Sequence, residues 1–330
     1  METRALGRTG VEVSPLCLGC MNFGWGTEEA DSIKIIHRAL DAGINFLDTA
    51  DVYGQGASET ITGKALRGKR DKVFLATKVH GKMGEGANQK GNSRLHIIRG
   101  CEDSLRRLGV EHIDLYQIHR PQSTVPIDET LRALDDLIGA GKVRYIGTST
   151  YGAWQLVESL WQSEKLNLNR FVCEQPPYNL LDRRIERELL PFAQTYGFGV
   201  IPWSPLAGGM LSGKYKRDTK NPEGSRYESG TFRNGEAVPE AAWDIIELVE
   251  TMSREKDCAM DALAVAWTLA NPVVTSAIIG PRTMEQLEAN LKSLDVEVTE
   301  DDKKRLDAAI KPGTHVAEYY GADFGPHPFR

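Results

Sequence analysis

Short hydrophobic runs alternate with longer amphipathic stretches along most of the chain. The short runs have the length and β-branched content of buried strands, and the stretches between them have the apolar period of helices. The predicted strands are 16–19, 45–48, 73–78, 113–119, 144–148, 171–174, 199–202 and 275–279. The predicted helices are 28–42, 58–66, 94–108, 128–140, 154–164, 183–196 and 261–270, with 284–291 after the last strand.

This repeat predicts an α/β fold with a parallel sheet, and eight is the number of strands that closes a (β/α)8, or TIM, barrel. An open doubly wound sheet is the alternative. The barrel is favoured because no glycine-rich dinucleotide-binding turn follows the first strand. Residues 3–13 predict an N-terminal β-hairpin that covers the bottom of the barrel.

Two further regions lie outside the strand-and-helix repeat. Residues 204–260 form a long insertion that ends in a predicted helix over 239–255, and extra helices follow at the C-terminus. No interdomain linker interrupts the pattern. We therefore expect residues 1–330 to form one barrel domain.

Composition narrows the class of protein. The formal net charge is −6, so the chain has no electrostatic attraction to nucleic acid or to an anionic membrane surface, and we expect neither as a partner. The odd, scattered cysteines do not form a disulfide pattern, and Cys17 and Cys20 are expected on opposite faces of a strand. The first residues lack the apolar core of a signal peptide, so we expect a cytoplasmic location.

Polar residues stand at the ends of several predicted strands, where a (β/α)8 barrel carries its reactive groups. They include Asp48, with Tyr53 five residues later, and then Lys78 and His119. A lysine ammonium beside a tyrosine is expected to lower the pKa of the phenol towards neutrality, and a carboxylate would hold that lysine charged. Each residue could instead be a cap, an ion pair or a buried histidine, and spacing alone does not decide.

Several motifs resemble one family. They are D-T-A-D-V-Y-G at 48–54, A-T-K at 76–78, D-L-Y-Q-I-H-R-P at 114–121, I-G-T-S at 146–149 and I-P-W-S-P-L-A-G-G-M-L-S-G-K-Y at 201–215. In order and spacing they resemble the aldo-keto reductase superfamily, in the branch that includes bacterial aldo-keto reductases and potassium-channel β-subunits. The resemblance implies reduction of an aldehyde or ketone by NADPH. It implies that Asp48, Tyr53, Lys78 and His119 form the catalytic tetrad, with Tyr53 as the general acid.

The same resemblance implies a binding site for NADPH or NADP+. The residues implied around the nicotinamide are Gly19, Cys20, Met21, Asp48, Ser149, Gln175, Trp203 and Ser204. Those implied in the loop that folds over the cofactor are Leu206, Gly208 and Lys214, and those around the adenosine phosphate and adenine are Gly280, Arg282, Gln286 and Asn290. Two positions depart from the family: Thr150 stands where Asn is frequent, and Gly280-Pro281 stands where many members carry Lys-Ser. Arg282 is therefore the main support for NADP.

Substrate contacts are expected from Trp25, Tyr53 and His119. Further rim candidates are Met21, His80, Tyr178 and the C-terminal aromatics Tyr319, Tyr320 and Phe324. We expect a small-molecule carbonyl substrate and no metal, and leave a homo-oligomer open.

One alternative function is that of a metal-dependent hydrolase using Asp48, His80, His119 and Glu174. It is disfavoured because the chain has no His-x-His pair. The other is a nucleotide-sensing regulatory subunit on the same fold.

Overall fold

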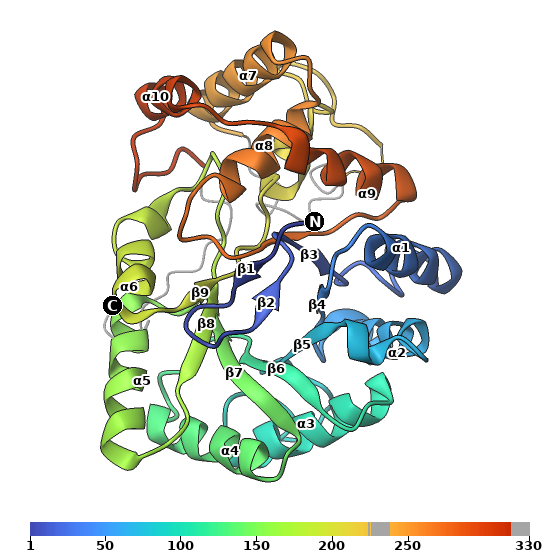
Figure 1. The fold of residues 1–330 in the computed structure, drawn as a ribbon, viewed down its shortest axis with the longest axis vertical. Coiled ribbons are helices and arrows are strands. Elements are labelled where there is room, and N and C mark those ends of the chain that lie inside the picture. The colour runs from blue at the N-terminus through green and yellow to red at the C-terminus, as the bar shows by residue number, and fades with distance from the viewer. Residues whose placement is uncertain (224, 226–237, 318–330) are drawn as a thin grey trace.

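The computed structural model describes residues 1–223, 225 and 238–317. Within them, eight parallel strands form the centre (Figure 1). They are β3 (Leu16–Gly19), β4 (Phe46–Asp48), β5 (Phe74–Val79), β6 (Ile113–Ile118), β7 (Val143–Ser149), β8 (Phe171–Gln175), β9 (Gly199–Val200) and β10 (Ala277–Ile279). Neighbours in the chain are neighbours in the sheet, and β10 pairs with β3. Bridges from Val200 to Val274 and from Trp203 to Ile278 join the last two strands, which confirms the expected barrel.

The inside of the barrel holds a small apolar core of its own. It consists of Leu6, Val13, Cys17, Phe46, Ala76, Leu115, Cys173, Ile201 and Ile278. Because side chains alternate along a strand, Cys17 faces this inner core, whereas Cys20 lies in the larger cluster between barrel and helices. The two cysteines thus face different cores, as expected.

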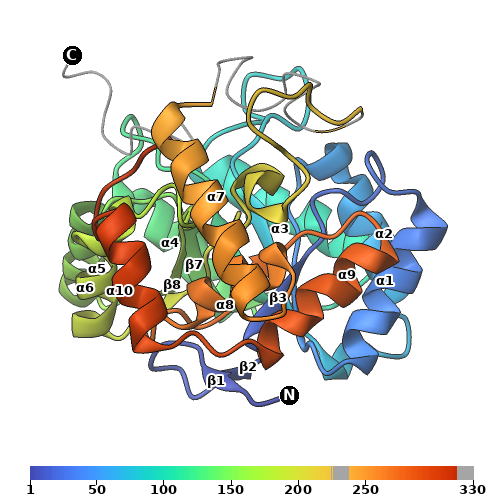
Figure 2. The same cartoon turned by 90° about the horizontal axis from the view of Figure 1, so that it is seen from above.

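The N-terminal hairpin closes one end of the barrel. Its strands β1 (Arg4–Ala5) and β2 (Glu12–Val13) are antiparallel, and the hairpin supplies two of the inner-core residues, Val13 of β2 and Leu6 directly after β1. Figure 2 shows the hairpin at one end of the barrel, away from the loops at the opposite end. The open end is therefore the one at which the strands finish, and it is there that functional side chains can gather.

Helices surround the barrel. They are α1 (Glu29–Asp41), α2 (Ala57–Ala65), α3 (Arg94–Leu108), α4 (Ile127–Gly139), α5 (Ala153–Leu166), α6 (Leu189–Tyr196) and α8 (Met260–Leu269). Each lays an apolar stripe on the sheet, as Leu131, Leu134 and Leu137 of α4 do at intervals of three residues. The helix α9 (Met284–Leu291) completes the ring between α8 and α1, and two more helices lie further out: α7 (Glu240–Glu255) and α10 (Glu300–Ala309).

Two helix predictions need correction. The helix expected over 183–196 is a 3-10 turn at Arg184–Glu186 followed by α6, because the backbone at Glu188 is not helical (φ −134°). The helix α10 is one of the extra C-terminal helices expected, but no residue range was predicted for it. Its N-terminus is capped by Thr299, whose hydroxyl accepts a hydrogen bond from the Asp302 amide while the Thr299 amide donates to the Asp302 carboxylate. The three-residue spacing of this capping box is visible in the sequence.

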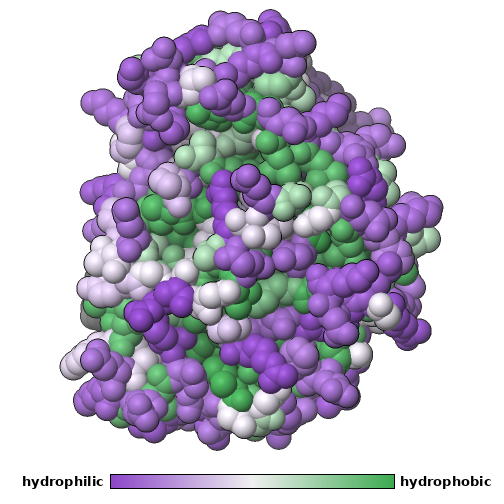
Figure 3. All heavy atoms as spheres, in the orientation of Figure 1, coloured by the Kyte–Doolittle hydropathy of each residue, from purple (hydrophilic) through white to green (hydrophobic). Residues whose placement is uncertain are grey.

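One face of the molecule can be followed by its hydropathy. Figure 3 shows the face with the hairpin, where hydrophilic residues dominate the rim and hydrophobic residues lie between them towards the middle. Among the residues that the structure describes, no helix is both long enough and apolar enough to cross a membrane.

Candidate active site

The segment after β4 brings Tyr53 over the end of β5. Its backbone continues the pairing of the sheet, since the Thr49 amide donates to the Ala76 carbonyl at 2.9 Å and the Asp51 amide to the Lys78 carbonyl at 3.1 Å. The chain then turns into a 3-10 helix at Tyr53–Gly56, in which Gly54 has a φ of +57°. Glycine adopts this conformation without strain, so the tight turn that presents Tyr53 fits the sequence.

Lys78 lies at the centre of the site. Its Nζ donates to Asp48 Oδ2 at 2.5 Å, to the Thr49 carbonyl at 2.7 Å and to the Tyr53 hydroxyl at 3.3 Å. The lysine is fully buried and Asp48 is 2% exposed. Burial acts to lower the pKa of the Lys78 ammonium, but the charge of Asp48 and the hydrogen bonds that the ammonium donates to Asp48 and Tyr53 prevail and raise it. Lys78 therefore remains an ammonium group over the whole physiological range.

The expected effect of Lys78 on Tyr53 is only half correct. The ammonium does favour the phenolate, but loss of hydration around the hydroxyl is the larger effect, and the pKa of Tyr53 is raised above its ordinary value. The prediction that the pKa of Tyr53 is lowered towards neutrality is therefore wrong for this structure. Tyr53 keeps its proton at neutral pH, which is the state that a proton donor requires.

His119 follows β6 and faces Tyr53. Its amide donates to the Val79 carbonyl at 2.9 Å, and the two rings meet edge-on with centroids 5.6 Å apart at 84°. Burial, together with the charges of Arg120 and Lys78, holds the pKa of His119 well below its ordinary value. The imidazole is therefore neutral, and one of its nitrogens can donate a hydrogen bond to a carbonyl oxygen.

The second oxygen of Asp48 is held by two glutamines. Oδ1 accepts a hydrogen bond from Gln117 at 3.0 Å and from Gln175 at 2.9 Å, and Gln175 also donates to Gln117 Oε1 at 3.1 Å. Gln175 was predicted as a cofactor ligand, whereas Gln117 was not singled out. Its place in the motif D-L-Y-Q-I-H-R-P, two residues before His119, was the available signal, because alternation puts both on one face of a strand.

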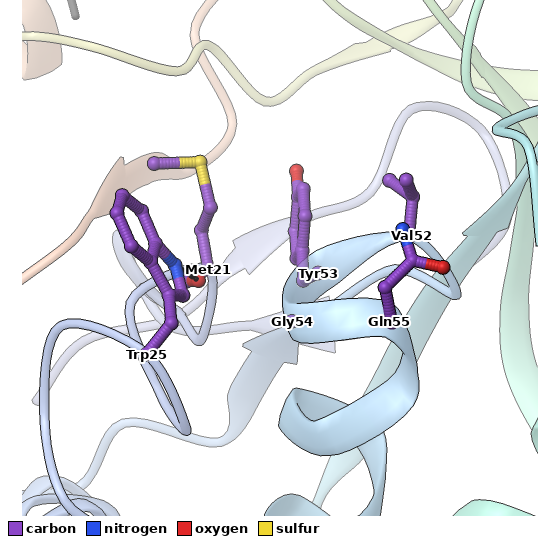
Figure 4. Close-up of a pocket in the computed structure, with 6 residues that line it drawn as sticks. All are labelled: Met21, Trp25, Val52, Tyr53, Gly54 and Gln55. Atoms are coloured by element: carbon purple, nitrogen blue, oxygen red, sulfur yellow. Dashed lines mark hydrogen bonds between the residues drawn. The ribbon is translucent and has the colours of Figure 1, made fainter.

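A cavity of about 350 Å³ opens beside Tyr53. It is lined by Met21, Trp25, Val52, Tyr53, Gly54 and Gln55. In Figure 4, Met21 and Trp25 stand on one side of the Tyr53 ring, and Val52 and Gln55 on the other. The Trp25 indole is 61% exposed, yet its Nε1 donates to the Met21 carbonyl at 2.8 Å. This bond fixes a large apolar wall at the mouth of the cavity.

The other rim candidates lie differently. Tyr178 is buried, and its hydroxyl donates to Glu186 at 2.6 Å, so its expected place on the rim is wrong. His80 is half-buried and its Nδ1 lies 2.8 Å from Asn92 Oδ1. Tyr319, Tyr320 and Phe324 lie outside the described residues.

Several residues expected around the nicotinamide lie near the end of the barrel where Asp48 is found. The Ser149 hydroxyl donates to the Gln175 carbonyl at 2.9 Å, and the Trp203 amide donates to the Pro176 carbonyl at 2.9 Å. A Cβ at Gly19 would lie 2.7 Å from Ile278 Cγ2, so only glycine fits there. Cys20 points its side chain into the outer core, which leaves only its backbone for contact with a cofactor.

The segment after β9 turns sharply several times. Ser204 has a φ of +57°, and Gly208 and Gly209 have φ values of +67° and +103°. Leu206 packs against the main core, and Lys214 is exposed with its Nζ 5.0 Å from the centroid of the Tyr215 ring. Backbone amides in such turns can surround an anion, as expected for a pyrophosphate. Residues 224 and 226–237 of this insertion are outside the described part of the chain.

The segment after β10 lies against the loop that carries Trp25. Asn22 Nδ2 donates to the Gly280 carbonyl at 3.1 Å, and the Thr27 hydroxyl donates to the Arg282 carbonyl at 3.0 Å. The Arg282 amide in turn donates to Gln286 Oε1 at 2.8 Å. Asn290, on the same helix α9, is buried. The residues expected around the adenosine phosphate and adenine therefore lie on the segment after β10 and on helix α9, beside the loop that carries Trp25.

The four residues of the alternative metal site do not converge. Both oxygens of Asp48 are taken by Lys78, Gln117 and Gln175, while Glu174 accepts hydrogen bonds from the Thr148 hydroxyl and the Tyr151 amide. In the part of the chain that the structure describes, no three His, Cys, Asp or Glu side chains are grouped as metal ligands. The geometry favours acid–base chemistry at Tyr53.

Comparison with known proteins shows which family the chain belongs to. The model of the Aldo/keto reductase family matches residues 15–311. An uncharacterized oxidoreductase of Bacillus subtilis is 41% identical, over 97% of this chain and 99% of that protein. A putative aryl-alcohol dehydrogenase of Saccharomyces cerevisiae is 36% identical, over 93% and 96%. A probable voltage-gated potassium channel subunit beta of Oryza sativa is 35% identical, over 97% and 100%.

The chain therefore belongs to the aldo/keto reductase family. The resemblance drawn from its motifs is confirmed, and so is the barrel fold that the resemblance implied. The family and the oxidoreductase among its relatives support carbonyl reduction as the general reaction.

Proposed function

We propose that this protein reduces an aldehyde or ketone to the alcohol with NADPH, and that Tyr53 is the general acid. One observation carries the proposal. A protonated Tyr53 hydroxyl accepts a hydrogen bond from the buried ammonium of Lys78, while its ring forms a wall of the cavity. A proton donor next to a fixed positive charge, at the edge of a cavity, is what carbonyl reduction needs, because negative charge develops on the oxygen in the transition state.

The residues divide the work in the following way. NADPH, when bound, supplies a hydride to the carbonyl carbon. Tyr53 gives its proton to the carbonyl oxygen, and the Lys78 ammonium stabilises the phenolate that remains. Neutral His119 donates a hydrogen bond to the same oxygen and orients it. Asp48 holds Lys78 in place through its Oδ2 atom. The alcohol forms when carbon has received the hydride and oxygen the proton, and the same groups serve the reverse reaction.

The chain offers a fitting place for a nicotinamide dinucleotide. Gln175 donates its two amide hydrogens to Asp48 and Gln117. Its carbonyl oxygen can therefore accept a hydrogen bond from a carboxamide. Gly19 gives a backbone without a side chain at the end of β3. At the far end, Arg282 and the N-terminus of α9 can bind a phosphate, which supports NADPH over NADH.

The cavity supports an apolar, ring-bearing aldehyde as the substrate. Trp25, Met21 and Val52 are apolar or aromatic walls, and the Trp25 indole is held in place by its hydrogen bond to the Met21 carbonyl. A fixed indole offers contact area at low entropic cost to a planar partner. The name of the yeast relative, a putative aryl-alcohol dehydrogenase, fits this class.

A panel of carbonyl compounds tests the proposal. We expect consumption of NADPH with benzaldehyde-type substrates, less with small polar aldehydes, and slower consumption of NADH at the same concentration. Trp25→Ala should raise KM for aromatic aldehydes and change KM for a short aliphatic aldehyde little. Absence of turnover across the panel, with NADPH still bound, would instead favour a regulatory subunit, the kind of protein named for the rice relative.

A further inference from the structure

Gln117 and Gln175 connect the acid–base centre to the expected cofactor site. The side chains of Gln117, Gln175 and Asp48 form a closed triangle of hydrogen bonds with donor–acceptor distances of 2.9 to 3.1 Å. All three are at most 3% exposed. We infer that Gln117 is a positioning residue that sets both the orientation of Asp48 and the orientation of the Gln175 amide. This inference rests on the proposed function.

The direction of the amides follows from chemistry. A carboxylate only accepts hydrogen bonds, so the NH2 groups of both glutamines must face Asp48 Oδ1. This leaves the carbonyl oxygen of Gln117 for the second hydrogen of Gln175, the bond found at 3.1 Å. Without Gln117, one hydrogen of the Gln175 amide would lack a buried partner, and the amide could rotate. Gln117 therefore fixes Gln175 as an acceptor towards the cofactor.

A glycine between the two strands makes the contact possible. Gln117 on β6 is paired in register with Gly147 on β7, and β7 separates it from Gln175 on β8. A Cβ at Gly147 would point at the Cys173 sulfur, 2.7 Å away, and at Leu115 Cδ1, 3.3 Å away, both in the inner core. The position thus faces the inside of the barrel. Because it carries no side chain there, the two glutamines can meet across the strand.

The triangle also determines which oxygen of Asp48 is left for Lys78. Two N–H donors occupy Oδ1, so Oδ2 alone faces the ammonium at 2.5 Å. Loss of the Gln117 donor would let the carboxylate turn, and the Lys78 ammonium would move with it relative to Tyr53. We therefore expect one substitution at Gln117 to affect proton transfer and cofactor binding together, although Gln117 itself contacts neither substrate nor Tyr53.

Two substitutions at this position test the inference. Gln117→Leu keeps the volume and removes both hydrogen bonds. Gln117→Glu can still donate to Asp48 and accept from Gln175 while its carboxyl is protonated, but once ionised it adds a negative charge beside Asp48. The charged groups that face the side chain at position 117 are Asp48 from β4 and Lys78 from β5. Tyr116→Phe is the matched control, because Tyr116 is the buried neighbour on the same strand, with its hydroxyl bonded to the Ile97 carbonyl on the opposite face.

We expect Gln117→Leu to lower kcat by about 10- to 100-fold, the range for a lost hydrogen bond to a charged group, and to weaken NADPH binding several-fold. Gln117→Glu should approach the natural kcat at low pH and lose it as pH rises, whereas Gln117→Leu stays low throughout. Tyr116→Phe should lower stability without moving kcat or the pH profile. A pH-dependent rescue confined to the glutamate variant is the result that a merely structural role would not produce.

Two results would overturn the inference. One is a Gln117→Leu protein with natural kcat and natural NADPH affinity. The other is a pair of Gln117 variants with the same pH profile. Affinity is measured by quenching of tryptophan fluorescence in the absence of any carbonyl compound. A natural protein that binds NADPH but turns nothing over would therefore contradict the proposed function, while binding to the Gln117 variants would still decide the inference.

Discussion

The ammonium of Lys78 lies 2.5 Å from Oδ2 of Asp48, and neither side chain has appreciable contact with solvent. Burying two charges costs about as much as their attraction returns, so such a pair adds little to stability. Its value here is geometric, because it fixes the ammonium 3.3 Å from the Tyr53 hydroxyl. Removing one partner, however, leaves a buried charge without compensation.

Asp48→Asn should therefore destabilise the protein as well as slow it. We expect the free energy of unfolding to fall by roughly 3–5 kcal/mol, as for other broken buried pairs, and turnover to fall with it. Urea denaturation measures the first effect. Asp31→Asn is the control, because Asp31 and its partner Lys34 are both more than 60% exposed, and an exposed pair contributes about 1 kcal/mol or less. Equal losses for the two variants would contradict the buried ion pair.

Tyr53→Phe removes the proposed acid and preserves the ring that lines the cavity. Turnover should fall by roughly two to four orders of magnitude, the usual range for general acid catalysis. NADPH binding should be almost unchanged, because other residues are proposed to hold the cofactor. Steady-state kinetics and fluorescence titration measure the two quantities separately. A variant with near-natural turnover would show that the proton comes from another group, and loss of NADPH affinity would mean that Tyr53 has a structural role.

The pH dependence of reduction should be flat around neutrality. The pKa of Tyr53 is raised by burial, so the phenol keeps its proton and the rate should decline only in strongly alkaline solution. The pKa of His119 is depressed, so the imidazole stays neutral and no inflection should occur near its ordinary pKa. Initial rates with saturating NADPH across the pH range measure the profile. A decline centred near neutrality would mean that one of these two directions is incorrect.

The choice between cofactors should depend on Arg282. A guanidinium can pair with the phosphate that distinguishes NADPH from NADH. Arg282→Ala should weaken NADPH binding by roughly 1.5–3 kcal/mol and leave NADH almost unaffected. Arg38→Ala is a fitting control, because Arg38 is a half-exposed arginine bonded to Glu288 of α9, the helix that follows Arg282. If NADPH and NADH lose equal affinity, Arg282 does not bind the phosphate.

The strands and most helices could be predicted because each rests on local information, whereas the proposed tetrad came from the resemblance of the motifs to the family. Hydrophobic period and strand ends place Asp48, Lys78 and His119 at one edge of the barrel without any knowledge of packing. What failed depends on surroundings that are distant in sequence. Burial reversed the expected shift of the Tyr53 pKa, and contacts with Glu186 took Tyr178 away from the rim. Gln117 was missed because its partner Gln175 is 58 residues away in the chain.

Glu174 should make stability depend on pH. Burial raises the pKa of its carboxyl to about 8, so in the folded protein it is protonated at neutral pH, whereas an unfolded chain has the ordinary value near 4.3. A group whose pKa is raised on folding contributes stability that is complete below the unfolded pKa and is lost as pH rises through the folded pKa. The free energy of unfolding should therefore fall as pH rises from about 4 to about 8.

Glu174→Gln mimics the protonated form and should remove this loss. Its amide can still accept from the Tyr151 amide and meet the Thr148 hydroxyl, the two contacts of Glu174. We expect the two proteins to unfold alike near pH 5 and the variant to be more stable by an amount on the order of 4 kcal/mol above pH 8. The stability of the variant should still fall with pH, but less steeply, because the pKa of Asp51 is raised to about 7 by burial and by Glu59. Urea denaturation at several pH values decides, since parallel curves for both proteins would mean that Glu174 is ionised in the folded state.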